Sequence, residues 1–130
     1  MAQDRVGTVR KIYDEWAEGD FRAGTELFDR YVMLVMRPEF PDAGTYLGPT
    51  AIGGYMREFL SGWSRVTLRA RELLDAGDTV LADVHQQGAG TSSGAPVDMH
   101  YWQAWTFRGQ SIIRIESIRT REEAFAALGL

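Results

Sequence analysis

The sequence has no cysteine, only two histidines and only four prolines among its 130 residues. Without cysteine, a disulfide framework, a thiolate metal site and a cysteine nucleophile are all excluded. Positive charge is also scarce, since 14 Lys and Arg face 18 Asp and Glu and leave a net charge of -4. Nucleic acid and anionic membranes are bound by clustered Lys and Arg, so we expect neither as a partner.

Long apolar runs are lacking as well. The first residues, MAQDRVGTVRK, contain no apolar signal region, and no stretch approaches the roughly 18 apolar residues of a membrane span. We therefore expect a cytoplasmic protein. Its 45% hydrophobic and 25% charged residues are typical of a globular protein, and the length predicts one domain over residues 1–130.

Apolar residues spaced three and four apart predict helices in the first half of the chain. The predicted elements are a helix over 5–17 that Gly19 ends, a helix after Asp20, a strand over 31–36, a loop over 37–44 and a helix over 48–63. Pro38 and Pro41 favour the loop because proline lacks the N–H that a strand needs. Pro49 suits the first turn of the third helix.

From residue 65 onward the apolar period changes to two, which indicates strands. The predicted strands cover 65–74, 79–88, 97–108 and 112–119. Thr120 followed by Glu123 is a capping box that predicts a short C-terminal helix. Three N-terminal helices covering the apolar face of an antiparallel sheet define an α+β fold.

Four segments carry a resemblance to a known superfamily: AEGDFRAGTELF, PDAGTYLGPTAIGGYM, LLDAGDTVLADV and WQAWTFRGQSIIRIESIRTREEAFAALG. They resemble the nuclear transport factor 2 superfamily, in particular SnoaL-like proteins of an actinobacterial type, over nearly the whole chain. The resemblance implies a cone-shaped, curved sheet around a hydrophobic pocket, and it points to a homodimer. It does not fix a reaction, because this fold serves isomerases, cyclases, dehydratases, epoxide hydrolases and binding proteins.

Hairpin geometry predicts which side chains share the inner face of the sheet. Three-residue turns at 76–78 and 109–111 would align one inner row of Glu72, Ala82, Gln103 and Ser117. In that row a buried Glu72 would suit a general acid or base, and Gln103 could stabilise an oxyanion. Alternatively, Glu72 lies near solvent or pairs with an arginine, and Gln103 and Ser117 form a satisfied hydrogen-bonded pair.

Other side chains are expected to line the same pocket. They are Trp16, Met36, Tyr46, Tyr55, Phe59, Val84, Gln86, Met99, Tyr101, Trp105 and Ser117.

The resemblance also shows which catalytic groups of the superfamily are missing. The tyrosine and the two aspartates of ketosteroid isomerases correspond to Ile12, Met36 and Gln103. The arginine and two aspartates of limonene epoxide hydrolases fall near Val84, Gln86 and Ser117. Neither mechanism is therefore inherited, and no cofactor is expected.

The two histidines raise the question of a metal site. The predicted register sets His85 opposite His100, with Asp83 and Asp98 nearby, on the outer face of the sheet. We predict no metal there. That face also carries Trp102 with other apolar side chains, and it suits the interface of a two-fold homodimer.

The sequence leaves three functions open. The first is a pocket protein that binds a small apolar molecule and acts on it by proton transfer, as a cofactor-free isomerase, cyclase or dehydratase. The second is a non-catalytic ligand-binding or sensing module. The third is an interaction module that uses the face of the sheet.

Overall fold

The computed structural model describes residues 4–91 and 94–130. Its elements are α1 (Arg5–Ala17), a 3-10 helix (Thr25–Leu27), β1 (Phe28–Met36), β2 (Gly44–Leu47), α2 (Gly48–Ser61), β3 (Trp63–Ala76), β4 (Thr79–Gly90), β5 (Pro96–Arg108), β6 (Ser111–Ile118) and α3 (Arg121–Ala127). Within these described residues, no helix is both long and apolar enough to cross a membrane.

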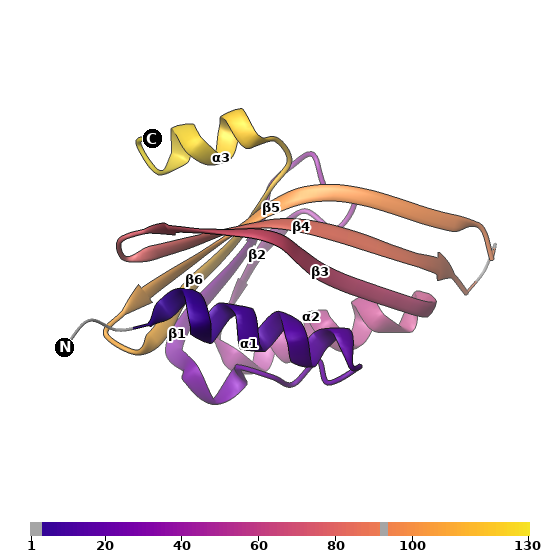
Figure 1. Ribbon diagram of the computed structural model, residues 1–130. Coiled ribbons are helices and arrows are strands. Elements are labelled where there is room, and N and C mark those ends of the chain that lie inside the picture. Colours follow the sequence, from indigo (N-terminus) through magenta and orange to yellow (C-terminus); the bar gives the residue numbers. More distant parts are fainter. Residues whose placement is uncertain (1–3, 92–93) are drawn as a thin grey trace.

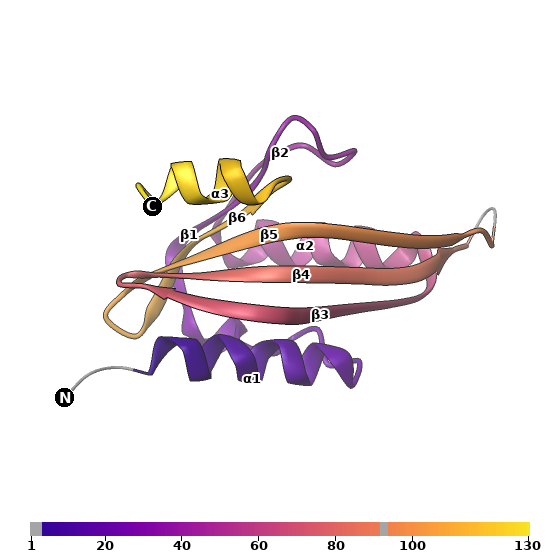
Figure 2. The ribbon, with the colours of Figure 1, turned by 45° about the horizontal axis from the view of Figure 1, so that its top comes forward.

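The six strands form one curved, open sheet in the order β2-β1-β6-β5-β4-β3. Strands β1 and β6 run parallel, whereas all other neighbours are antiparallel. Helices α1 and α2 lie on one face of the sheet, which we call the inner face, and α3 lies on the opposite, outer face (Figures 1 and 2). The predicted α+β class, with helices covering a curved sheet and a short C-terminal helix, is confirmed.

The predicted second helix is wrong. The residues after Asp20 form turns and the short 3-10 helix, and the chain then enters β1 directly. Gly24 adopts a left-handed φ of 84°, which interrupts a right-handed helix after only a few residues. The four-residue strand β2 was also missed, because it is too short to show a period and is held by its pairing with β1.

The inner face carries the larger of two apolar clusters. It joins Val9, Ile12 and Tyr13 of α1 to strand residues such as Val80, Val84 and Trp105, all of them buried. Apolar residues on one stripe of a helix gain stability by leaving water against such a face, which is why α1 packs there.

The second cluster lies on the outer face and is covered by α3. It contains Leu81, Trp102, Ala104, Ile118 and Ala124. The rings of Trp102 and Phe125 meet edge to face with centroids 6.1 Å apart, and Trp102 is only 9% exposed. The apolar surface predicted for self-association is therefore covered by the chain's own C-terminal helix. Thr120 caps this helix as expected, since its hydroxyl accepts a hydrogen bond from the Glu123 amide.

Candidate functional site

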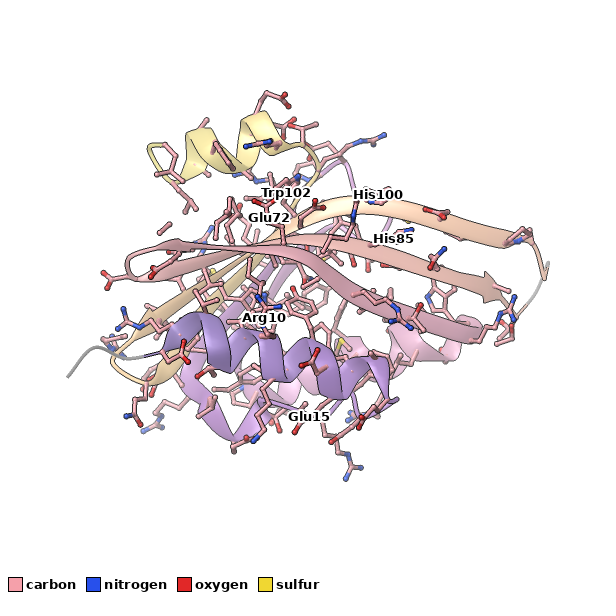
Figure 3. The ribbon with its side chains drawn as sticks, viewed as in Figure 1. Arg10, Glu15, Glu72, His85, His100 and Trp102 are labelled. Atoms are coloured by element: carbon pink, nitrogen blue, oxygen red, sulfur yellow. The ribbon has the colours of Figure 1, made fainter. Side chains whose placement is uncertain are left out.

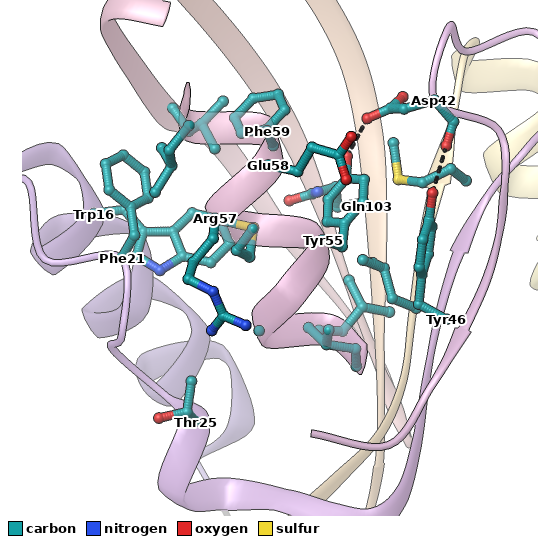
Figure 4. A pocket seen from close by; sticks show the side chains of 18 of the residues that line it. Trp16, Phe21, Thr25, Asp42, Tyr46, Tyr55, Arg57, Glu58, Phe59 and Gln103 are labelled. Atoms are coloured by element: carbon teal, nitrogen blue, oxygen red, sulfur yellow. Dashed lines mark hydrogen bonds between the residues drawn. The ribbon is translucent and has the colours of Figure 1, made fainter. Parts of the chain in front are cut away.

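A cavity of about 1260 Å³ lies between the inner face of the sheet, α2 and the segment that connects α1 to β1 (Figure 4). Most of the predicted pocket residues line it: Trp16, Met36, Tyr46, Tyr55, Phe59, Gln86, Met99, Tyr101 and Gln103. Val84, Trp105 and Ser117 do not. They are almost fully buried behind the lining and support it from the core.

The register of the three central strands agrees with the prediction. Ala82 pairs with Gln103, Gln103 pairs with Ser117, and Gln86 pairs with Met99. Both predicted three-residue turns are in fact two-residue turns, and the ladder of each hairpin contains a bulge. The bulge between β5 and β6 restores the expected pairing of Gln103.

The corresponding bulge in β3 removes Glu72 from the site. Ala70 pairs with Val84, but Glu72 pairs with Asp83, so the ladder gains a residue at Arg71. The inner position beside Ala82 is therefore taken by Leu73. Glu72 is exposed on the outer face, on the side of the sheet that carries α3 (Figure 3). The prediction that Glu72 belongs to the inner row is wrong.

A chain of hydrogen bonds fixes Gln103. The Trp105 indole N–H donates to the Tyr13 hydroxyl over 2.9 Å, and that hydroxyl donates to Oε1 of Gln103 in a short bond. Because an indole can only donate, the Tyr13 proton must go to the amide oxygen. Nε2 of Gln103 is thereby turned to Ser117 Oγ, 3.3 Å away, and one of its two N–H groups has no partner among the described residues.

Gln86 is held in the same way by Tyr101. The Tyr101 hydroxyl donates to Oε1 of Gln86 over 2.7 Å, and Nε2 of Gln86 has no partner within the described chain. Burial raises the pKa of Tyr101 and also that of Tyr13, so both phenols stay protonated donors at neutral pH. Both amides of the sheet therefore offer a ligand N–H donors that have no partner among the described residues.

Sequence reasoning missed Tyr13 as a polar site residue. The resemblance set the isomerase tyrosine at Ile12, whereas the structure brings the hydroxyl of the next residue, Tyr13, onto Gln103. Tyr13 belongs to the apolar stripe of α1, and that position is the signal that would have directed attention to it.

A second missed residue is Asp42, which lies in the loop between β1 and β2. Its carboxylate accepts a short hydrogen bond from the Tyr55 hydroxyl, and its backbone oxygen accepts one of 3.2 Å from the Tyr46 hydroxyl. Buried Phe40 fixes the loop by packing edge to face on Tyr101, with centroids 5.5 Å apart. Of the carboxylates described at the cavity, Asp20 and Glu58 are exposed and Asp42 is half-buried.

The histidines lie on the outer face, where the expected pairing of His85 with His100 is confirmed. Asp98 accepts a hydrogen bond of 2.8 Å from His85 Nε2, and this bond lowers the pKa of Asp98. Nη1 of Arg71 lies 3.3 Å from Nδ1 of His100, so that nitrogen must act as an acceptor. Ligand atoms of His85, Asp98 and His100 lie within 4.8 Å of one another, and the two imidazole rings are stacked nearly parallel with centroids 4.3 Å apart.

Comparison with known proteins identifies the family. Residues 9–115 match the SnoaL-like domain, and the chain belongs to this family of the nuclear transport factor 2-like fold. No curated protein matches the sequence significantly.

Solved structures share the fold at low identity. A protein described as a SnoaL-like polyketide cyclase from Jannaschia is 18% identical, with a TM-score of 0.76 over 98% of this chain and 97% of that one. TerC, crystallised with polyporic acid, is 17% identical, with a TM-score of 0.75 over 96% and 98%. A Catenulispora acidiphila protein with a ketosteroid isomerase-like fold, in complex with trimethylamine, is 18% identical, with a TM-score of 0.74 over 100% and 95%.

Proposed function

We propose that this protein binds a small, largely apolar molecule in the inner cavity and holds an acceptor oxygen of that molecule on the amides of Gln103 and Gln86. The observation that carries the proposal is the orientation of the two amides. Their oxygens already accept hydrogen bonds from Tyr13 and Tyr101, whereas each Nε2 keeps at least one N–H without a partner among the described residues. A carbonyl or enolate oxygen is the complementary group.

The composition of the cavity supports an apolar ligand body. Trp16, Met36, Phe59 and Met99 line it, and buried Ile52 and Leu68 add to the same surface. Crystal structures of same-fold proteins with polyporic acid and with trimethylamine are consistent with a cavity that receives small molecules.

The proposal is tested with two molecules of one shape, acetophenone and ethylbenzene, which differ in the carbonyl oxygen. Calorimetric titration should show that acetophenone binds about five to ten times more tightly, the value of one or two net hydrogen bonds. Gln103→Met should remove most of this preference, whereas Gln110→Met at the exposed β5–β6 turn should keep it. Equal binding of the two molecules by the unaltered protein would contradict the proposal.

Proton-transfer catalysis is the second candidate, and the donor chain ending at Gln103 favours it. Such a chain can stabilise negative charge that develops on a substrate oxygen. With Glu72 on the outer face, the remaining half-buried carboxylate described at the cavity is Asp42. A cofactor-free isomerase, cyclase or dehydratase would use it as the base. Exchange of the acetophenone methyl protons for deuterium, catalysed by the protein and lost in Asp42→Asn, would establish this activity.

We also propose a cytoplasmic homodimer that associates through the part of the outer face not covered by α3. Arg65 and Arg69 of β3 are exposed there, and so are Asp98 and His100 of β5 on the far side of β4. A two-fold axis would place one protomer's arginines against its partner's carboxylates. Sedimentation at micromolar concentration should show a dimer at low salt that dissociates in 0.5 M NaCl or in Arg69→Glu, because salt screens such pairs. A monomer at low salt would exclude the interface.

A further inference from the structure

The wall of the cavity opposite Trp16 carries a negative charge without a positive partner. Oδ2 of Asp42 accepts the hydrogen bond of Tyr55, and Oδ1 has no partner among residues 4–91 and 94–130. The salt bridges of that part of the chain do not include Asp42. A half-buried carboxylate that lacks a salt bridge would be stabilised by a bound cation.

Two tyrosine hydroxyls contact Asp42, and their rings belong to a row of three aromatic rings. The Tyr46 and Tyr55 rings lie with centroids 4.7 Å apart, and Phe59 stacks beyond Tyr55 with a centroid distance of 6.1 Å. Burial and the hydrogen bond to Asp42 raise the pKa of Tyr55, and the charge of Asp42 also helps to raise the pKa of Tyr101. Aromatic rings attract cations as well, so the carboxylate and the aromatic wall favour the same kind of ligand.

Arg57, one of the two arginines at the cavity, lies away from Asp42. Figure 4 draws Arg57 on the side of Trp16, Phe21 and Thr25, and draws Asp42 on the side of Tyr46. Arg57 is exposed and makes no salt bridge with a described residue. Its guanidinium lies along Gly53 and Gly54 of α2, 3.6 and 3.8 Å from the positions of their missing side chains. The Arg57 guanidinium therefore does not neutralise Asp42, and the Asp42 carboxylate is available to a ligand.

We propose that Asp42, Tyr46 and Tyr55 form a subsite for a positively charged amine of the ligand. The inference rests on the proposed binding function and adds to it a substrate class: an apolar amine with an acceptor oxygen at its other end. The carboxylate supplies the charge and the ring faces supply the apolar contact that an alkylammonium group needs. Tyr55 is a positioning residue, because its hydroxyl holds the carboxylate in place.

The test compares choline with 3,3-dimethylbutan-1-ol, which has the same shape but carries a carbon in place of the charged nitrogen. Binding followed by NMR titration should favour choline about tenfold in the unaltered protein. Asp42→Asn should abolish this preference, and Glu58→Gln, which removes an exposed carboxylate at the same cavity, should preserve it. Equal affinity for the two molecules, or a charge preference that survives Asp42→Asn, would overturn the proposal.

Two further measurements separate this result from the general binding proposal. Thermal unfolding of each variant shows whether the variant is folded. The comparison of choline with 3,3-dimethylbutan-1-ol in the unaltered protein does not depend on any variant. Asp42→Asn should still prefer acetophenone to ethylbenzene, because Gln103 and Gln86 are untouched. Loss of the choline preference with retention of the acetophenone preference supports the amine subsite. If acetophenone and ethylbenzene bind equally while choline is still preferred, the amine subsite is supported and the acceptor site at Gln103 and Gln86 is contradicted.

Discussion

The hydroxyl of Tyr13 lies between the indole N–H of Trp105 and the amide oxygen of Gln103. One phenol therefore ties α1 to β5 and at the same time decides which end of the Gln103 amide faces the cavity. Its aromatic ring contributes to the core as well, since it meets the Trp105 ring edge to face with centroids 5.7 Å apart.

Tyr13→Phe should keep the ring packing and lose the hydrogen bonds. It leaves the Trp105 N–H and the Gln103 oxygen buried without partners, which should lower the free energy of unfolding by about 2–3 kcal/mol. Urea denaturation measures the change. Tyr31→Phe is the control, because Tyr31 is 72% exposed, and it should change stability by less than about 0.5 kcal/mol. Equal effects of the two substitutions would show that the hydroxyl of Tyr13 does not stabilise the fold.

Stability should fall in alkaline solution. The pKa values of Tyr13, Tyr55 and Tyr101 are raised in the folded protein, chiefly by burial. In the unfolded chain these phenols ionise near pH 10, so the folded state holds its protons more tightly above that pH. The contribution of these protonated phenols to the free energy of unfolding is complete below about pH 10 and is lost as the pH rises further.

Absorbance of tyrosinate near 295 nm, recorded together with far-ultraviolet circular dichroism, follows this transition. Part of the absorbance change should coincide with unfolding. The Tyr101→Phe variant should show a shallower decline of stability with pH. Complete ionisation of all five tyrosines in a folded protein would contradict the prediction.

Glu72→Gln should leave ligand binding unchanged, since Glu72 lies on the outer face opposite Asp83. Like charges directly opposite each other destabilise a sheet, so the free energy of unfolding should be unchanged or rise by up to about 0.5 kcal/mol. The affinity for acetophenone and the urea midpoint check both statements. A weaker affinity for acetophenone in Glu72→Gln would show that Glu72 contributes to binding in the pocket.

Gly88→Ala should destabilise the β3–β4 ladder. A side-chain carbon at Gly88 would lie 2.3 Å from the Arg65 carbonyl oxygen and 2.9 Å from the Trp63 ring, so the backbone has to move. Overpacking of this kind costs about 1–3 kcal/mol. At Gly62, the nearest atom to such a carbon is the Phe59 carbonyl oxygen at 3.6 Å, and Gly62→Ala should be nearly neutral. Equal urea midpoints for the two variants would contradict the predicted clash.

The sequence predicted the central strands well because period two fixes the face of every side chain. The pairings of Gln103 with Ser117 and of His85 with His100 follow from that alternation together with hairpin closure. The turn lengths were wrong, and the pairing of Gln103 was still right. The bulge beside Phe107 compensates for the shorter turn, since a strand cannot slip by one residue without exposing its apolar face.

Glu72 shows where this reasoning ends. A bulge at Arg71 is a local departure from alternation, and the sequence of β3 contains no glycine or proline to mark it. One extra residue exchanged the positions of Glu72 and Leu73, and with them the predicted acid or base of the site. Asp42 was missed for a different reason: it belongs to a loop, and its partner Tyr55 lies on another element.

The sequence by itself determined the α+β class, the inner face of β4, β5 and β6 and the apolar stripe of α1, because these depend on local periodicity and on burial. The tertiary structure alone decided which polar groups meet between elements that are not neighbours in the sheet. The Tyr13 hydroxyl reaches Gln103 only when α1 packs on the sheet, and Asp42 reaches Tyr55 only when the β1–β2 loop folds against α2. Hydrogen bonds between distant segments depend on distance and angle in space, which no local pattern records.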